Sequence, residues 1–327
     1  MVTPSIIAEG PLIQEIWRAN PWVSTKGMLV GINAGLGAGR FPFRNADNYW
    51  RWVALCEQSQ LDSIWHSDRI LSEHPFVESM SMMAALAGAT RRIKFGMNSA
   101  VLSFRDPVML AKQCATIDYI SNGRLLPSFG IGGPRVPEFA SGAFDGSARG
   151  KRANEALEVM SRLWSEDQVD YEGEFFKLSN ASINPKPVQK HFPVWIGGNS
   201  AAAQMRTAKY GTGWLGGLSS VDTVAATVSG IKDALQVTGR HIADDHYGAT
   251  IVFRFAEPAE KAKVFVPKVF EALSVVGDAH NILSLMNQYT AVGISKFVAI
   301  PLADNDEDMI LQSQLFIDEL LPVLGSL

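Results

Sequence analysis

The feature that most constrains the fold is a repeated alternation of short apolar strands with helical segments along the chain. Strands joined by helical crossovers pair in parallel, because each crossover returns the chain to the same end of the sheet. Eight such units within 327 residues match a closed (β/α)8 TIM barrel better than an open doubly wound sheet, which remains the alternative. The expected strands are residues 28–32, 61–68, 92–102, 123–132, 193–198, 213–217, 247–255 and 295–302, and the expected helices include 47–60, 76–89, 107–120 and 151–165.

One segment interrupts this alternation after the fourth strand-helix unit. Residues 168–187, QVDYEGEFFKLSNASINPKP, have a glycine turn between short alternating stretches, which is typical of a hairpin or an extended excursion. We therefore predict an insertion at this point in the barrel. No repeat or change in composition marks a domain boundary. Residues 27–327 are thus expected to form one barrel domain, preceded by a surface arm at residues 1–26.

Composition and charge narrow the classes of function. With 47% hydrophobic and 19% charged residues and no membrane-length apolar run, the sequence is typical of a globular protein. A net charge of -4 disfavours broad attraction to nucleic acid or to an anionic membrane, which leaves small molecules as the expected partners. Cys56 and Cys114 lie far apart in the sequence, within helical patterns, which favours two reduced thiols over a disulfide. The N-terminus lacks a signal-peptide pattern. We expect a cytoplasmic protein.

Candidate site residues follow from the strand ends, because TIM barrels place catalytic groups at the C-terminal ends of their strands. The glycine pair Gly197 and Gly198 allows a ligand to approach the backbone closely, and Asn199 or Ser200 then begins a helix. Free N–H groups at a helix start attract anions, so a phosphate is the expected occupant. A tight strand-to-helix turn is the alternative interpretation. The candidate segments are residues 33–39, 66–69, 97–105, 130–135 and 197–200.

The end of the second expected strand carries polar side chains suited to proton transfer. His66 and Asp68 alternate with Trp65 and Ser67, so they are predicted to point together toward the barrel mouth. A hydrogen-bonded structural histidine is the alternative for His66, and His74 is expected to be a solvated loop residue. The six histidines show no metal-ligand spacing, so no metal site is expected.

Four longer segments carry a family resemblance. LDSIWHSDRI, FRDPVMLAKQCATIDYISNGRLLPSFGIGG, PKPVQKHFPVWIGGNSAAAQMRTAKYGTGWLGG and AVGISKFVAIPL resemble the bacterial-luciferase-like superfamily of flavin- and deazaflavin-dependent oxidoreductases. The resemblance covers roughly residues 27–325. It implies a TIM barrel, a flavin-type cofactor, a small-molecule substrate and a homodimer.

The resemblance also implies where the cofactor binds. The glycine pair with Asn199 is expected to grip its phosphate. The third strand is expected to support its ring at Asn98 and Ser99, often through a bulge with a non-proline cis peptide. The glycine-rich stretch FGIGGP, which is not a full G-x-G-x-x-G motif, adds Gly132 and Gly133 to the predicted cofactor site.

The residues after the second strand bear on which cofactor is used. Ser67 and Asp68 resemble the deazaflavin-dependent members, but Arg69 replaces a histidine that several members use beside the reacting carbon. An arginine is a poor acid at neutral pH, yet it can hold an anionic group of substrate or cofactor. Asp68 is therefore expected to orient the ring or substrate, with His66 as the remaining proton-transfer candidate.

Coenzyme F-420, acting in hydride transfer to or from a small organic substrate, is the first choice of cofactor. Its anionic tail is expected near four cationic side chains. A reduced-FMN-dependent monooxygenase is the enzymatic alternative, and a non-catalytic flavin-binding barrel is the third. The expected tail residues are Arg135, Arg149, Lys151 and Arg152.

Overall fold

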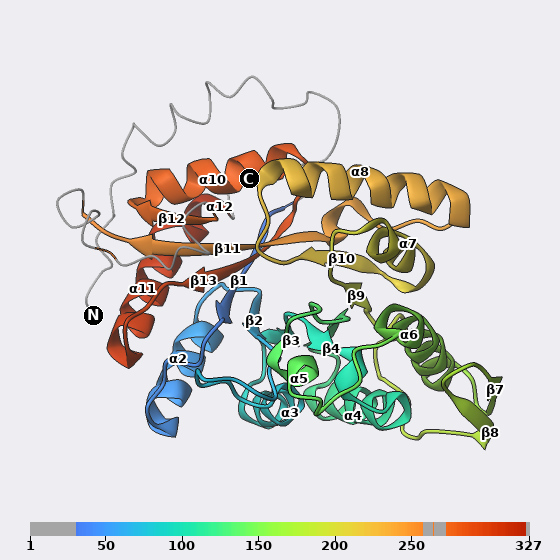
Figure 1. Ribbon diagram of the computed structural model, residues 1–327. Helices are drawn as coiled ribbons and strands as arrows, with labels where there is room; N and C mark the ends of the chain where they lie inside the picture. Colours follow the sequence, from blue (N-terminus) through green and yellow to red (C-terminus); the bar gives the residue numbers. More distant parts are fainter. Residues whose placement is uncertain (1–30, 258–263, 265–272, 325–327) are drawn as a thin grey trace.

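The computed structural model describes residues 31–257, 264 and 273–324, and Figure 1 shows a curled sheet with helices around it. Within these residues the main sheet has eleven strands, and all of their pairings are parallel. Its strands are β1 (Asn33–Ala38), β2 (Ser63–His66), β3 (Lys94–Met97), β4 (Ala100–Val101), β5 (Leu125–Leu126), β6 (Ser128–Gly130), β9 (Trp195–Ile196), β10 (Gly213–Gly216), β11 (Tyr247–Phe255), β12 (Ser274–Gly277) and β13 (Lys296–Pro301).

Helices connect most of these strands, as the alternation predicts. The principal helices are α2 (Ala46–Gln58), α3 (Ser79–Ala89), α4 (Pro107–Ser121), α6 (Arg149–Ser165), α7 (Ala201–Tyr210), α8 (Val221–Thr238), α10 (Ala279–Ala291) and α11 (Asp306–Glu319). Short helical turns are η1 (Leu102–Phe104), α5 (Pro137–Ala140), η2 (Asp244–His246) and α12 (Leu321–Leu324). Pro107 begins α4 directly after Asp106, whose carboxylate accepts the N–H groups of Val108 and Met109. Asp106 is therefore the N-cap of α4.

The order of pairing shows how far the sheet curls. β1 pairs with β2, β2 with β3 and β3 with β5. β4 pairs with β6, and the pairing continues through β9, β10, β11 and β13 to β1. β3 and β4 are consecutive parts of one chain segment, as are β5 and β6, so these pairings belong to one strongly curled sheet.

Side chains inside the curl confirm this geometry. Trp65, Trp195, Leu215 and Val298 form one buried cluster, although they come from β2, β9, β10 and β13. Strands on different sides of the sheet can share such a cluster only if the sheet bends around it. The cluster fills the interior with bulky side chains, as in the packed core of a TIM barrel.

The first strand lies later in the chain than predicted. Residues 28–30 are outside the described part, residues 31–32 are not in a strand, and β1 is the glycine-rich Asn33–Ala38, which was expected to follow the first strand. A Cβ on Gly35 would lie only 2.4 Å from Ser63 Oγ on the neighbouring β2. Glycine therefore belongs in this strand because its neighbour occupies the space a side chain would need.

The predicted hairpin is present as a small sheet of its own. β7 (Val169–Glu172) and β8 (Lys177–Ala181) pair antiparallel after α6, outside the main sheet. The Glu155 carboxylate on α6 accepts the N–H groups of Glu174 and Phe175 at 2.9 Å each, which fixes the turn of the hairpin.

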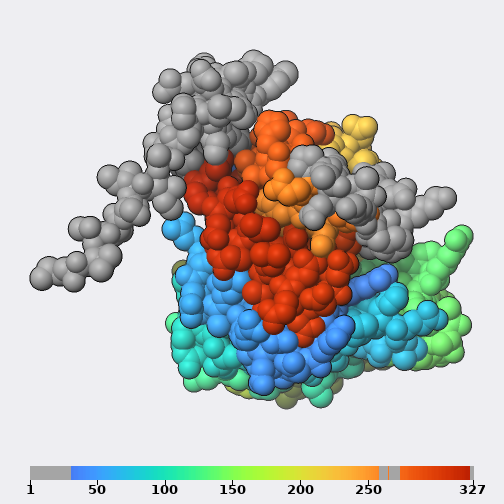
Figure 2. All heavy atoms as spheres, turned by 90° about the vertical axis from the view of Figure 1, so that its left-hand side faces the viewer, coloured from blue at the N-terminus to red at the C-terminus, as the bar shows by residue number. Residues whose placement is uncertain are grey.

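The beginning and the end of the described chain meet at one side of the sheet. Figure 2 shows this side, with the C-terminal segment in red beside the blue N-terminal elements. Trp52 Nε1 on α2 donates to Ser313 Oγ on α11 at 2.9 Å. The arm predicted at residues 1–26 lies outside the described residues. In the part of the chain that is described, no helix is long and apolar enough to cross a membrane.

Candidate functional site

A cavity of about 960 Å³ opens where the strands of the curled sheet end. It is lined by the segments that follow β1, β2, β3, β6, β9, β10 and β13, so it lies at the end of the sheet that the barrel rule selects. Predicted site residues on its wall are Asp68, Arg69, Asn98, Ser99, Gly132, Gly133, Gly197, Gly198 and Asn199.

One side of the cavity is formed by the turn from β9 into α7. Gly198 has a φ of 105°, a conformation that glycine adopts readily and other residues rarely do. A Cβ on Gly197 would lie 2.8 Å from Ser99 Oγ, so the backbone here is closely packed against the third strand segment. Ser200 caps α7 by accepting the N–H of Ala203, and the first N–H groups of such a helix remain available to an anion.

Arg206 extends this anion-attracting surface. It lies on α7, lines the cavity and is only 5% exposed. Its Nε donates to Asn154 Oδ1 at 2.7 Å and its Nη2 donates to the Gly150 carbonyl at 3.2 Å. Burial lowers the pKa of Arg206, but a guanidinium remains charged at neutral pH. These bonds hold a positive charge beside the glycine turn.

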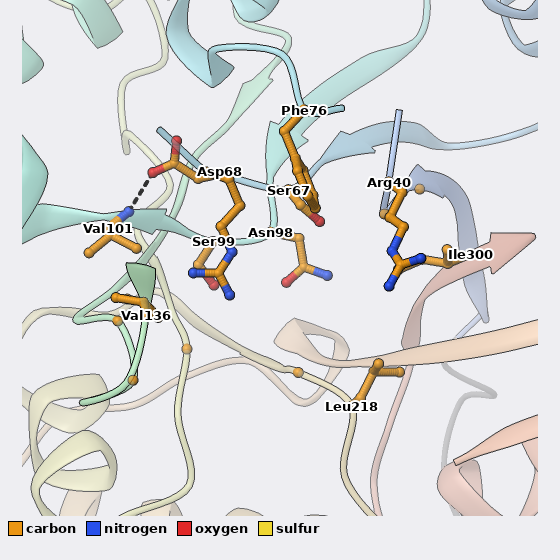
Figure 3. A pocket seen from close by; sticks show the side chains of 18 of the residues that line it. Arg40, Ser67, Asp68, Phe76, Asn98, Ser99, Val101, Val136, Leu218 and Ile300 are labelled. Atoms are coloured by element: carbon orange, nitrogen blue, oxygen red, sulfur yellow. Dashed lines mark hydrogen bonds between the residues drawn. The ribbon is translucent and has the colours of Figure 1, made fainter. Parts of the chain in front are cut away.

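The middle of the cavity is formed by the break between β3 and β4. The Asn98–Ser99 peptide is cis, as the family resemblance predicts. Asn98 Nδ2 donates to Thr250 Oγ1 at 2.8 Å, and this hydroxyl donates to the Gly216 carbonyl at 2.8 Å. The chain of hydrogen bonds fixes the Asn98 amide, which lies within the cavity in Figure 3.

Asp68 is held by an ion pair and by hydrogen bonds. Arg105 reaches its two carboxylate oxygens at 2.6 and 2.7 Å. Ser79 Oγ donates to Oδ1 at 2.9 Å, and the Val101 N–H donates to Oδ2 at 2.8 Å, the bond drawn in Figure 3. Burial opposes the charge on Arg105, but its hydrogen bonds to Asp68 outweigh this and raise its pKa. With these bonds, Asp68 is suited to fixing the β4 backbone.

Two further arginines line the cavity. Arg69 Nη1 lies 3.6 Å from Glu138 Oε2, and the Glu138 carboxylate also accepts the N–H groups of Ile70 and Leu71. Arg40 follows β1 and is exposed, and no ion pair or hydrogen bond joins its side chain to another described residue. The wall thus carries positive charge that the protein only partly neutralises.

His66 does not lie where the sequence suggested. It faces α2, where its Nε2 lies 3.0 Å from Tyr49 Oη among the rings of Phe41 and Trp52, and it does not line the cavity. The reason is the alternation of the strand: Trp65 points into the interior cluster, so its neighbour His66 must point outward. Complete burial lowers the pKa of His66 to about 3, which keeps the imidazole neutral. His74, predicted to be a solvated loop residue, is exposed and lines the cavity.

The four cations predicted to bind a cofactor tail are not on the cavity wall. Lys151 lies 3.5 Å from Glu174, Arg152 lies over the Phe176 ring, and Arg135 is exposed. Arg149 differs, because its Nε is buried and has no hydrogen-bond partner among the described residues.

Sequence reasoning missed Arg40, Arg105 and Arg206 as parts of the site. Arg40 follows a strand that was assigned too early. Arg206 is on a helix and reaches the cavity only because the helix packs beside α6. Arg105 was within a candidate segment, but the sequence gives no sign that it pairs with Asp68. In the described residues, no group of His, Cys, Asp or Glu side chains could hold a metal ion. Cys56 and Cys114 are free and buried, as predicted.

Solved structures give the same fold. The chain aligns with an F420-dependent secondary alcohol dehydrogenase at a TM-score of 0.76 and 17% identity, covering 90% of this chain and 99% of that one. It aligns with the monooxygenase RslO1 from Streptomyces bottropensis at a TM-score of 0.78 and 20% identity, covering 89% and 99%. Both likenesses support the curled α/β fold of luciferase-like TIM-barrel proteins.

Sequence comparison identifies the family. An FMNH(2)-dependent dimethylsulfone monooxygenase of Pseudomonas fluorescens is 29% identical over 210 residues, which are 62% of this chain and 56% of that protein. The chain spans about half the length of the curated relatives it matches. The family model for luciferase-like monooxygenases matches residues 28–295. The chain therefore belongs to the luciferase-like monooxygenase family.

Proposed function

We propose that this chain is an oxidoreductase that binds a phosphate-bearing, flavin-type ring in the cavity and acts on a small organic molecule beside it. One observation carries the proposal: the Gly197–Gly198 turn, the start of α7 and Arg206 lie together at one side of a large cavity, an arrangement suited to holding an anion. The cavity volume of about 960 Å³ is at the upper end of the usual range for small-molecule sites. The ring, when bound, supplies the hydride or oxygen chemistry.

The protein's own residues would bind and orient the cofactor. The turn after β9 and Arg206 would hold the phosphate. The fixed amide of Asn98 and the Ser99 hydroxyl would face the ring from the third strand segment, and Gly132 and Gly133 would leave room after β6. Asp68 would act as a positioning residue, because its bonds to Arg105 and to the Val101 N–H fix the segment that supports the ring. Arg69 would face the substrate side, whereas His66, which does not line the cavity, would take no part in proton transfer.

Coenzyme F-420 is the first candidate cofactor, with hydride transfer as the reaction. Arg206 Nη2 donates to the Gly150 carbonyl, so the start of α6 lies beside the proposed phosphate site. The neighbouring Arg149 has a buried Nε without a partner among the described residues. An anionic tail beyond the phosphate would supply the acceptor that this donor lacks.

FMN is the second candidate, with reduced-FMN-dependent monooxygenation as the reaction. The observation that favours it is that none of the four predicted tail cations lines the cavity; these are Arg135, Arg149, Lys151 and Arg152. FMN ends at its phosphate and needs no cations beyond it. The relative from Pseudomonas fluorescens is named as FMNH(2)-dependent.

Titration with both cofactors at low and high salt tests the choice. We expect F-420 to bind more tightly than FMN and its affinity to fall more steeply with salt, because contacts of a charged tail are screened. Arg149→Gln should weaken F-420 binding and leave FMN binding unchanged, with Arg135→Gln as the exposed control. Tight FMN binding with undetectable F-420 binding would replace the first candidate by the second.

We also propose the finer architecture that the sequence suggests. The sheet is taken as a closed (β/α)8 barrel formed by residues 27–327, with the β7–β8 hairpin as an insertion after the fourth unit and residues 1–26 as a separate arm. The active form is proposed to be a homodimer, which the sedimentation velocity of the purified protein would test.

A further inference from the structure

The charge on the cavity wall exceeds what one phosphate requires. Arg40, Arg69 and Arg206 line the cavity, whereas Asp68 is the only carboxylate among the described lining residues. Asp68 is already neutralised by Arg105, which binds both of its oxygens. Cavities lined by charge of one sign concentrate the opposite charge. The excess positive charge therefore indicates that the cavity binds anions. The positions of the three arginines indicate how many anionic groups it binds.

Arg40 lies opposite the proposed phosphate site. It follows β1, whereas the glycine turn follows β9. Around the sheet, β1 and β9 are separated by β2 and the β3–β4 and β5–β6 segments in one direction, and by β13, β11 and β10 in the other. Neighbouring strands are about 4.8 Å apart, so four steps either way place the two at opposite rims of the mouth. An anion at the glycine turn would not neutralise Arg40.

Aliphatic side chains share the cavity with Arg40, which is itself exposed. Figure 3 shows its guanidinium beside Ile300, with Val101 and Val136 on the far side of the cavity. Ile300 packs on the first strand, since a Cβ on Gly37 would lie 2.9 Å from its Cγ1. Leu218, Leu302 and Met309 line the cavity as well. A positive charge without a partner among the described residues, in a cavity with aliphatic side chains on its wall, matches a molecule with an apolar body and one negative end.

We propose that the substrate is a small organic acid, with an apolar body and one carboxylate or sulfonate group bound by Arg40. This inference rests on the proposed function, because it assigns the rim opposite the cofactor phosphate to the substrate. Arg69 is the lesser contributor, since Glu138 lies 3.6 Å from its guanidinium. Arg206 serves the cofactor. The guanidinium provides paired donors for the two oxygens of a carboxylate.

The test compares acids with their neutral amides on the cofactor-loaded protein. Phenylacetate and octanoate are titrated against phenylacetamide and octanamide, and the change in cofactor absorbance reports binding. We expect each acid to bind at least about tenfold more tightly than its amide, which corresponds to about 1.4 kcal/mol. Arg40→Gln should abolish this preference. Its side chain has no partner among the described residues, so the variant should fold normally.

Two controls and the cofactor itself separate the outcomes. Arg135→Gln, an exposed change off the cavity wall, should retain the preference, and Arg69→Gln should lose less of it than Arg40→Gln. Equal binding of acids and amides to the loaded wild-type protein would overturn the inference, as would a preference that depends on Arg69 alone. A cofactor affinity that falls in Arg40→Gln would assign Arg40 to the cofactor instead. If neither FMN nor F-420 binds the wild-type protein, the proposed function fails and the inference fails with it.

Discussion

The two ends of strand β2 carry aspartates in opposite settings, a partly buried Asp62 before the strand and a buried Asp68 after it. Before the strand, Asp62 accepts hydrogen bonds from Lys296 and Lys94, below an interior filled by Trp65 and its cluster. After the strand, Asp68 is bound by Arg105 but faces a cavity of about 960 Å³. Burial would raise the pKa of Asp62, but the two lysines outweigh it and lower the value to about 2.

These two settings indicate that one end of β2 contributes to stability and the other end to function. At the packed end, the ion cluster of Asp62, Lys94 and Lys296 joins the start of β2 to β3 and β13. None of these three residues lines the cavity. At the open end, glycines and short polar side chains leave room for a ligand. TIM barrels divide their two faces in this way, with stability at the N-terminal end of the strands and chemistry at the C-terminal end.

The largest effect is expected from Asp62→Asn, which leaves the buried Lys296 without its counter-charge. Breaking one partner of a buried ion pair costs about 3–5 kcal/mol, so the free energy of unfolding should fall by that amount. Cofactor affinity of the folded fraction should stay unchanged. Urea unfolding monitored by fluorescence, with a cofactor titration on the same sample, checks both. Glu172→Gln removes an exposed ion pair with Lys177 and should change the unfolding midpoint little.

The same variant should alter the pH dependence of stability. The Asp62 pKa is about 2 in the folded protein and near 3.8 when unfolded, so its contribution is complete above pH 4. It should be lost as pH falls from about 4 to about 2, because the unfolded state then binds the proton first. Asp62→Asn should lack this part of the acid transition. An unchanged acid profile would contradict the role of the ion cluster.

Asp68→Asn is expected to lower the free energy of unfolding by less than Asp62→Asn does, and also to weaken cofactor binding. The change weakens charged hydrogen bonds to Arg105, worth about 1.5–3 kcal/mol. Because Asp68 also holds the Val101 N–H, we expect cofactor affinity to fall about tenfold, or about 1.4 kcal/mol. Glu78→Gln is the control, since Glu78 also bonds Arg105 but does not line the cavity. It should lower stability without changing cofactor affinity, and equal affinity losses in both variants would refute the positioning role.

The sequence predicts the repeating architecture better than it predicts the direction in which individual side chains point. Alternating strands and helices identify the sheet, and strand ends identify most of the cavity wall. The position of β1 was not predicted correctly because glycines are uncommon in strands. Gly35 lies in β1 because Ser63 on the neighbouring strand leaves no room for a side chain, and the sequence alone does not show this contact. His66 was assigned to the mouth because alternation gives two faces but not which one is inward. Arg206 reaches the site through packing between helices, which periodicity does not encode.

The smallest effect on function is expected from His66→Gln. His66 is buried against α2 with a pKa near 3, so it is neutral in the folded protein and becomes charged below about pH 6.5 when unfolded. Wild-type stability should therefore rise with pH between about 3 and 6.5, with this residue contributing a slope of about 1.4 kcal/mol per pH unit. The variant should lose that slope and keep its cofactor affinity. A marked fall in affinity would restore His66 to the site.

The most direct test of the account compares each cofactor with its phosphate-free form. FMN is titrated against riboflavin, and F-420 against its riboflavin-like deazaflavin core, on the wild-type protein and on Gly198→Val. We predict that a phosphate-bearing compound binds the wild type about 100-fold more tightly than its phosphate-free form, a difference of about 2.7 kcal/mol. The difference should vanish in Gly198→Val, and Gly142→Val, a glycine at a φ of 76° that does not line the cavity, should retain it. Equal affinities with and without the phosphate in the wild-type protein would contradict the central claim.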